Sequence, residues 1–240
     1  MNKSTFHRQI ASNIANSQIH ITLVQQSYLP RYAYTIGLYP DYKFELIFAG
    51  GYLLSNQQVF SLINYANQII RECLHPDGVS FTTPFGEFQL ASVGKRWSEN
   101  LMIGVSDYYQ LKCFNAFQII PSKERRSIEI PDMSIQLNSK TAGCWRFLID
   151  AWEYSIPKLS TVLTDLDVLM GKPVVELVRV EEDQWEMFSG PGFDFEKSNL
   201  RIIPIGVLLE KDITLRSSLT IPVDKGLYRN NLQHRWKDWG

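Results

Sequence analysis

Short segments with a strand-like pattern recur along the whole chain and outnumber the long stretches with a helical period. In residues 32–38, bulky side chains alternate with small ones, and residues 46–49 are continuously apolar, as in a strand buried on both faces. Many short strands with few long helices argue against a doubly wound parallel sheet. We therefore expect an α+β fold, with a mainly antiparallel sheet and packed helices in two modules. The expected strands cover residues 19–24, 32–38, 46–49, 81–93, 114–120, 174–180 and 184–189.

The clearest helix signal begins at Ser55, whose spacing to Gln58 is that of a capping box. Apolar side chains then follow at helical period as far as Cys73, and Pro76 stops the helix. Apolar residues also recur at helical spacing elsewhere, which predicts further helices over residues 6–16, 145–152 and 159–170.

The most polar stretch of the chain lies near its middle and contains Pro131. Such composition is typical of an exposed connection between domains. The sequence therefore predicts an N-terminal α+β module over residues 1–122, a linker or exposed loop over 123–142, and a C-terminal α+β module over 143–240.

Composition excludes several classes of function. The chain has 240 residues, and 45% of them are hydrophobic, which is enough to bury one large core or two small ones. Its 24 basic and 25 acidic residues leave a formal charge of −1, so we expect no bulk affinity for nucleic acid or anionic lipid. No apolar run reaches the roughly 18 residues of a membrane-spanning helix, and the first residues do not resemble a signal peptide.

Familiar chemical motifs are missing. The chain has no glycine-rich phosphate loop, HExxH, CxxC or GxSxG. Its three cysteines, Cys73, Cys113 and Cys144, are odd in number and far apart, which favours a reducing cytoplasm over a disulfide framework or a zinc site. We therefore expect neither a metal nor a cofactor.

The histidines leave one catalytic alternative open. His20 and His75 could form the acid–base pair of a hydrolase if folding brought them together. The favoured interpretation is structural, because His20 falls on the polar face of a strand and His75 stands beside a helix C-terminus, where a cation is favourable.

Two charged segments are candidates for binding. Lys123, Arg125 and Arg126 form a small basic cluster, which we interpret as a solvated loop because three charges are weak evidence for phosphate binding. Residues 176–196 contain seven acids against Arg179 alone. On a hairpin these carboxylates concentrate at the tip and on one side, where they either deter aggregation, the favoured interpretation, or recruit a basic partner. The acids are Glu176, Glu181, Glu182, Asp183, Glu186, Asp194 and Glu196.

The first half of the chain carries a family resemblance. Tyr34-Thr35-Ile36-Gly37-Leu38 is followed by Glu45-Leu46-Ile47-Phe48-Ala49-Gly50, a capped helix, and then Ala116-Phe117-Gln118-Ile119-Ile120. This order resembles the bacterial "domain of unknown function 4262" family. The resemblance implies an α+β domain and no known chemistry.

A second resemblance covers residues 175–236. The segment holds a hairpin, Asp183-Gln184-Trp185-Glu186-Met187-Phe188-Ser189-Gly190, then Leu208-Leu209-Glu210-Lys211-Asp212, and finally Gly226, Arg229 and Trp236. It looks like a small bacterial module in which a Trp-x-Phe-x-Gly hairpin precedes a short helix and a final Gly…Arg…Trp. Similar modules occur among immunity proteins that neutralise antibacterial toxins.

Three functions follow as hypotheses. The first is a cytoplasmic immunity protein that binds a cognate, basic toxin, with a nuclease as the expected class, and has no catalysis of its own. The second is a hydrolase that uses His20 or His75, and the third is an interaction module without a toxin partner. Under the first hypothesis, carboxylates pair with basic groups in the toxin cleft, and aromatic residues serve as apolar anchors. The expected toxin-binding residues are Glu181, Glu182, Asp183, Glu186, Asp194 and Glu196, with Trp185, Phe188 and Phe193 as the anchors.

Overall fold

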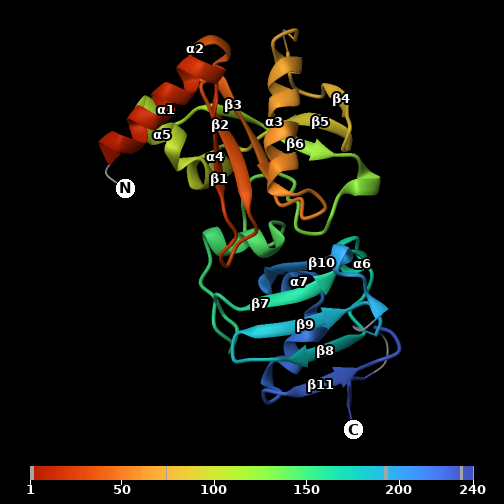
Figure 1. Ribbon diagram of the computed structural model, residues 1–240. Helices are drawn as coiled ribbons and strands as arrows, with labels where there is room; N and C mark the ends of the chain where they lie inside the picture. The colour runs from red at the N-terminus through yellow and green to blue at the C-terminus, as the bar shows by residue number, and fades with distance from the viewer. Residues whose placement is uncertain (1–2, 74, 192–193, 233–234, 240) are drawn as a thin grey trace. The chain divides into compact units, whose positions relative to one another are not determined.

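The computed structural model describes residues 3–73, 75–191, 194–232 and 235–239, and the chain divides into two compact units (Figure 1). The first unit comprises residues 1–25, 31–126 and 132–138, and the second comprises residues 26–30, 127–131 and 139–240. Among the described residues, each unit contains one six-stranded sheet that is mixed but mostly antiparallel. The predicted α+β class with two modules is therefore confirmed. None of the described helices is long and apolar enough to cross a membrane.

The first sheet has the strand order β1-β2-β3-β6-β5-β4, in which, among the described residues, only β3 and β6 pair in parallel. The elements of this unit, in chain order, are α1 (Lys3–Ser17), β1 (His20–Val24), β2 (Tyr32–Ile36), α2 (Tyr39–Tyr42), β3 (Phe44–Ala49), α3 (Asn56–Ile70), β4 (Ser80–Thr83), β5 (Gly86–Ser92), α4 (Lys95–Leu101), α5 (Ile103–Tyr109), β6 (Asn115–Pro121) and η1 (Lys123–Arg125).

The core of the first unit follows from the sequence pattern. Every residue of β3 is buried, as its continuous apolar run predicts for a central strand. Helix α3 covers one face of the sheet and begins with the predicted capping box, in which the Ser55 hydroxyl accepts from the Gln58 amide and the Gln58 side chain accepts from the Ser55 amide. Helices α4 and α5 contact β6 and β2, respectively, and lie behind the sheet in Figure 1, whereas α3 lies in front.

The second sheet has the strand order β10-β7-β9-β8-β11-β12, with β7 and β9 parallel. Its unit contains η2 (Gly143–Leu148), β7 (Thr161–Asp165), α6 (Leu166–Leu169), β8 (Glu176–Arg179), β9 (Gln184–Phe188), η4 (Lys197–Asn199), β10 (Leu200–Pro204), α7 (Gly206–Lys211), η5 (Ile213–Thr220), β11 (Lys225–Tyr228) and β12 (Lys237–Asp238). The predicted hairpin over residues 174–189 is β8 and β9, and Trp185 and Met187 lie on one face of it, as expected.

The helix predicted over residues 159–170 is wrong. Residues 161–165 form β7, and only residues 166–169 form a short helix. The spacing of apolar residues alone does not distinguish a helix from a strand here, because Val162 and Leu163 are compatible with both. Pairing with β9 on one side and β10 on the other supplies partners for the β7 backbone, and this tertiary contact determines the strand.

Residues 123–142, predicted as a linker or exposed loop, are divided between the two units. Residues 123–126 and 132–138 belong to the first unit, and residues 127–131 and 139–142 belong to the second. The segment also contributes buried side chains, including Ile130, Met133 and Leu137.

Candidate binding surface

Three carboxylates lie together on the turn between β8 and β9, which we call the acidic turn (Glu181, Glu182 and Asp183). All three residues are exposed. The backbone amides of Val180 and Glu181 donate to the carbonyl of Gln184 at 2.9 and 3.1 Å and so close the turn. A tight turn between two paired strands brings consecutive side chains close together, so like charges concentrate at this tip.

Arg179 is the one base within residues 176–196, and it does not neutralise the acidic turn. Its guanidinium lies 5.3 Å from the centroid of the Trp185 ring and donates to the backbone carbonyls of Ile221 and Glu182 at 3.0 and 3.1 Å. Among the described residues, the carboxylates of the acidic turn form no ion pair; Glu181 accepts one hydrogen bond, from the Gln184 amide. All three carboxylates are therefore exposed and outside any ion pair with a described residue, although the Arg179 guanidinium contacts the backbone of the turn.

The acidic turn adjoins the side of the second sheet that faces away from α7, which we call the open face. It is defined by a row of register partners that crosses the sheet: Ile202, Leu163, Glu186, Val178 and Gly226. Residues on the opposite side, such as those next to Glu186 in β9, are buried, and α7 lies behind the strands in Figure 1. Because side chains alternate along a strand, the row presents apolar groups around one carboxylate.

Large apolar side chains are exposed at both ends of this row. Ile202 is 57% exposed and Trp239 is 47% exposed. The Trp239 ring covers Gly226, where a Cβ atom would lie only 3.0 Å from the ring. A larger residue at position 226 would displace the ring, so Gly226 fixes Trp239 on the open face. Ile202 and Trp239 therefore expose apolar surface at the two edges of the open face.

Two expected apolar anchors are not on the surface. Trp185 is 1% exposed and Phe188 is 6% exposed. Trp185 lies on the inner side of the sheet, opposite Val162 and Arg179, and the Phe188 ring contacts the Phe195 ring at a centroid distance of 5.5 Å. Both are core residues of the folded chain. Phe193 lies outside the described residues.

The predicted acidic residues are not all brought together. Glu186 lies in the middle of β9 and is half-buried, whereas Asp194 and Glu196 are exposed and follow the far end of that strand. A strand of five residues spans about 16 Å, so Asp194 and Glu196 form a group separate from the acidic turn.

The two histidines of the hydrolase hypothesis lie on separate elements. His20 is in β1, where its Nδ1 lies 2.8 Å from the Asn13 amide nitrogen, and burial lowers its pKa. His75 is exposed in the loop after α3. No hydrogen bond or ion pair links them in the part of the chain that the structure describes.

A histidine that sequence analysis missed does form a pair. His7 Nε2 lies 2.8 Å from the Asp107 carboxylate, and the pair links α1 to α5. A separation of 100 residues gives no signal in the sequence. Within the described ranges, no group of three or more histidine, cysteine, aspartate or glutamate side chains could hold a metal ion.

The block that carries the first resemblance forms one hydrogen-bonded unit around the fully buried Glu45. One carboxylate oxygen accepts from the backbone amides of Gly37, Leu38 and Tyr39 at 2.9 to 3.1 Å. The other accepts from the Thr35 hydroxyl at 2.6 Å. Burial raises the pKa of Glu45, although these four donors oppose that effect. The block thus fixes the turn after β2.

Gly37 has a conformational role in the same block. Its φ is +137°, and a Cβ atom there would lie 2.7 Å from the carbonyl oxygen of Gln18. Only glycine satisfies both conditions without displacing the backbone. The geometry of one turn therefore accounts for the combination of Thr35, Gly37 and Glu45 in this block.

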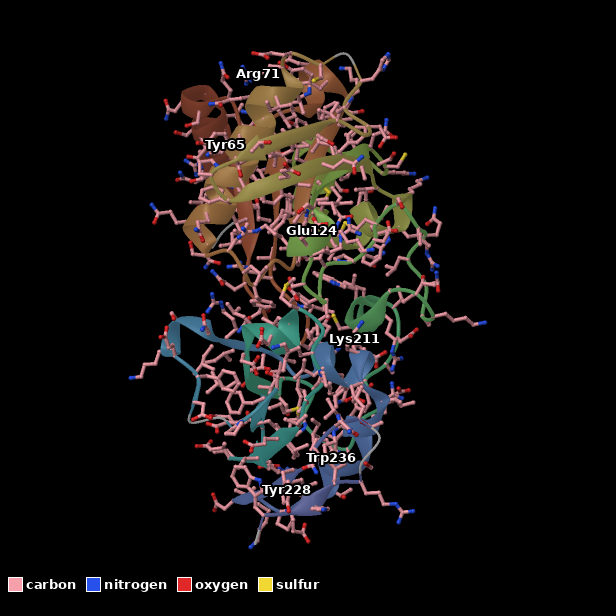
Figure 2. All side chains as sticks on the ribbon, turned by 90° about the vertical axis from the view of Figure 1, so that its right-hand side faces the viewer. Tyr65, Arg71, Glu124, Lys211, Tyr228 and Trp236 are labelled. Atoms are coloured by element: carbon pink, nitrogen blue, oxygen red, sulfur yellow. The ribbon has the colours of Figure 1, made fainter. Side chains whose placement is uncertain are left out.

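Two residues of the segment that carries the second resemblance, Arg229 and Asp212, form a buried ion pair. The Arg229 side chain is 1% exposed, and its guanidinium donates to Asp212 at 2.7 Å, to the Thr214 hydroxyl at 2.6 Å and to the carbonyl of Val174 at 2.8 Å. It also lies 4.1 Å from the centroid of the Trp236 ring, which is labelled in Figure 2. Trp236 is therefore a structural residue of the second unit.

Sequence analysis also missed a charged cluster beside α7. The guanidinium of Arg146 donates to Glu210 at 3.0 Å and to Asp150 at 3.2 Å, and it also pairs with Glu153. Burial and the adjacent Glu210 carboxylate raise the pKa of Tyr154 to about 12. Each carboxylate of this cluster is in an ion pair with Arg146, and Arg216 also pairs with Glu153 and Glu210, in contrast to the carboxylates of the acidic turn.

Comparison of the chain with protein-family models, curated proteins and solved structures gives no match.

Proposed function

We propose that this chain is an immunity protein, which binds a basic toxin in the cytoplasm and neutralises it without catalysis of its own. The single observation that supports this most is the acidic turn, whose three exposed carboxylates form no ion pair with any described residue. The resemblance of residues 175–236 to modules of immunity proteins points to the same class of partner.

A nuclease is the toxin class that suits this surface best. Nuclease active sites hold phosphates and are therefore lined with basic groups. An inhibitor can occupy such a cleft with carboxylates placed where the phosphates would lie. The acidic turn is a hairpin tip, so it can enter a cleft, and its charges increase the rate of encounter with a basic partner.

The apolar part of the contact is assigned to the open face. Because Trp185 and Phe188 are buried, Ile202 and Trp239 take the role of apolar anchors in this proposal. Glu186 lies between Leu163 and Val178, so a basic side chain bound there would be surrounded by apolar groups. Such a partly desolvated charge pair contributes more to affinity than one at the rim.

The proposal is tested by co-expression. We expect a toxin reading frame beside the gene for this chain, and we expect the chain to restore the growth of cells that produce that toxin. Toxicity that is unchanged by the chain would contradict the proposal. Hydrolysis by the purified chain that is abolished by His20→Ala or His75→Ala would support the hydrolase hypothesis instead.

Reversing the charges of the acidic turn should slow binding. For the variant Glu181→Lys, Glu182→Lys, Asp183→Lys, we expect association with the toxin to be at least roughly tenfold slower at low salt. The difference in association rate between this variant and the wild type should become smaller as the salt concentration is raised, because salt screens exposed charges. The matched control is Asp194→Lys with Glu196→Lys, which reverses charges beyond the far end of β9. If the wild type and the turn variant associated with the toxin at equal rates, the result would contradict the assignment of the acidic turn to the interface.

Ile202→Ser tests the open face. Because Ile202 is 57% exposed, we expect its replacement to change the free energy of unfolding by less than about 0.5 kcal/mol. We expect affinity for the toxin to fall about tenfold, through faster dissociation. Ile213→Ser is the control, since Ile213 is 68% exposed and lies in η5, outside the sheet. Loss of affinity in the control alone would place the interface elsewhere.

A further inference from the structure

A polar hollow of about 490 Å³ lies in the first unit, between the β4–β5 hairpin and the segment that follows β6. Alternation along the two strands determines its lining. Phe81 and Phe88 are buried in the core beneath α3, so their neighbours in the strands face the other way. The side chains relevant to binding are Ser80, Thr82, Glu87, Gln89, Lys123 and Arg126.

The positive charge of this hollow comes from the segment that follows β6. Lys123 and Arg126 are exposed residues of the segment after β6, and no ion pair joins either of them to a described residue. Glu124, labelled in Figure 2, lies between them in the chain but does not line the hollow. Hydrogen bonds to its own backbone amide and to Ser122, together with the charge of the adjacent Lys123, lower the pKa of Glu124. Lys123 and Arg126 therefore supply the two positive charges of the lining.

The rest of the lining offers hydrogen bonds to neutral groups. The hydroxyls of Ser80 and Thr82 and the amide of Gln89 can both donate and accept, and the Glu87 carboxylate only accepts. Glu87 repels a second anionic group but binds ligand hydroxyls. The Phe81 and Phe88 side chains are buried in the core, so they do not form an exposed stacking surface for a nucleobase.

We propose that this hollow binds a small, hydroxyl-rich molecule that carries one phosphate group, a sugar phosphate by chemical class. Lys123 and Arg126 would hold the phosphate, because guanidinium and ammonium groups are the usual partners of phosphate oxygens. Glu87, Gln89 and the two hydroxyls would bind the sugar. This site lies in the first unit and is independent of toxin binding, which is assigned to the second.

Calorimetric titration with glucose 6-phosphate tests the proposal. We expect saturable binding at low ionic strength and at least a tenfold loss of affinity in Lys123→Ala with Arg126→Ala. Glucose alone and inorganic phosphate alone should each bind at least tenfold more weakly than the sugar phosphate. Glu87→Gln should weaken binding of glucose 6-phosphate without weakening that of inorganic phosphate. All three substituted residues are exposed, so the variants should fold.

The matched control removes two other exposed cations of the same unit, in Lys95→Ala with Lys112→Ala, and should bind as the wild type does. Absence of saturable binding to the wild type would overturn the proposal. So would wild-type affinity in the Lys123 and Arg126 double variant, or an equal loss of affinity in the control, which would indicate a general effect of charge.

Discussion

Replacing Glu45 by alanine should lower the free energy of unfolding of the first unit by about 4 kcal/mol. The variant leaves the amides of Gly37, Leu38 and Tyr39 without their acceptor; Leu38 is buried, and Gly37 and Tyr39 are half-buried. It also removes the acceptor of the Thr35 hydroxyl. Each buried donor without a partner costs about 1–3 kcal/mol, and water that enters the space left by the side chain recovers part of the total.

Glu45→Gln should lower the free energy of unfolding by less than half as much as Glu45→Ala does. A glutamine keeps a carbonyl oxygen for the three amides, and its amino group can donate to the Thr35 oxygen, which already accepts from the Leu46 amide at 2.9 Å. Amide hydrogen exchange of β2 and β3, followed during denaturation, reports on this unit directly. The control is Glu87→Ala, which removes an exposed carboxylate from the same sheet. It should lower the free energy of unfolding by less than about 0.5 kcal/mol. An alanine variant as stable as the control would contradict the role of Glu45.

The titration of the same carboxyl group should make the stability of the first unit depend on pH. Burial raises the pKa of Glu45, so the folded chain keeps a proton on it at pH values where the unfolded chain has lost it. The stability that this group contributes is therefore complete below the ordinary pKa of glutamate and declines as the pH rises through the raised value. We expect the stability difference between the wild type and Glu45→Gln to decrease over that range, because glutamine does not titrate. An increase would indicate that the four donors, rather than burial, dominate.

Arg229→Met should destabilise the second unit by about 3–5 kcal/mol, because it leaves the carboxylate of Asp212 without its partner. The Asp212 side chain is 16% exposed, so solvent compensates little of the lost interaction. The carbonyl of Val174 and the hydroxyl of Thr214 lose a donor as well. Lys225→Met, which removes an exposed cation from the same part of the sheet, should cost less than about 0.5 kcal/mol.

A double-mutant cycle separates the ion pair from packing. Asp212→Asn keeps an oxygen that can accept from the Thr214 amide, so the cap of η5 is retained. If the charge pair accounts for the loss, Arg229→Met with Asp212→Asn should cost at least about 1 kcal/mol less than the sum of the single changes. Additive losses would show that Arg229 contributes through its other contacts, which are the hydrogen bonds to Val174 and Thr214 and the packing against Trp236. Equilibrium denaturation followed by hydrogen exchange of β8 and β11 provides the measurement.

Several elements followed from local sequence alone. The capping box of Ser55 and Gln58 and the helical stripe after it determined α3, because both act between residues of one or two turns. The strands of the hairpin and the position of the acidic turn were predictable for the same reason. Consecutive acids in a turn lie together in any fold that forms the turn. Helices α4 and α5 were not predicted, since residues 101–105 are too short an apolar run to assign.

The tertiary structure decided which of these surfaces is covered. Alternation in β9 placed Trp185 and Met187 on one face, but it could not show that this face is the buried one. Phe188 falls on the opposite face and is nevertheless buried, because Phe195 from the following loop covers it. Two expected anchors are therefore buried, and the proposal assigns their role to Ile202 and Trp239.

Hydrogen-bonded and ion pairs between residues far apart in the chain could not be predicted from the sequence, for a physical reason. Periodicity reports which face of its own element a residue occupies, whereas a hydrogen-bonded pair depends on how distant elements align. Arg146 and Glu210 are 64 residues apart, and Arg229 and Val174 are 55 apart. The sequence by itself determined the α+β class, the two modules and the acidic turn. The pairing of distant strands decided which charges are compensated in the interior and which remain available to a partner.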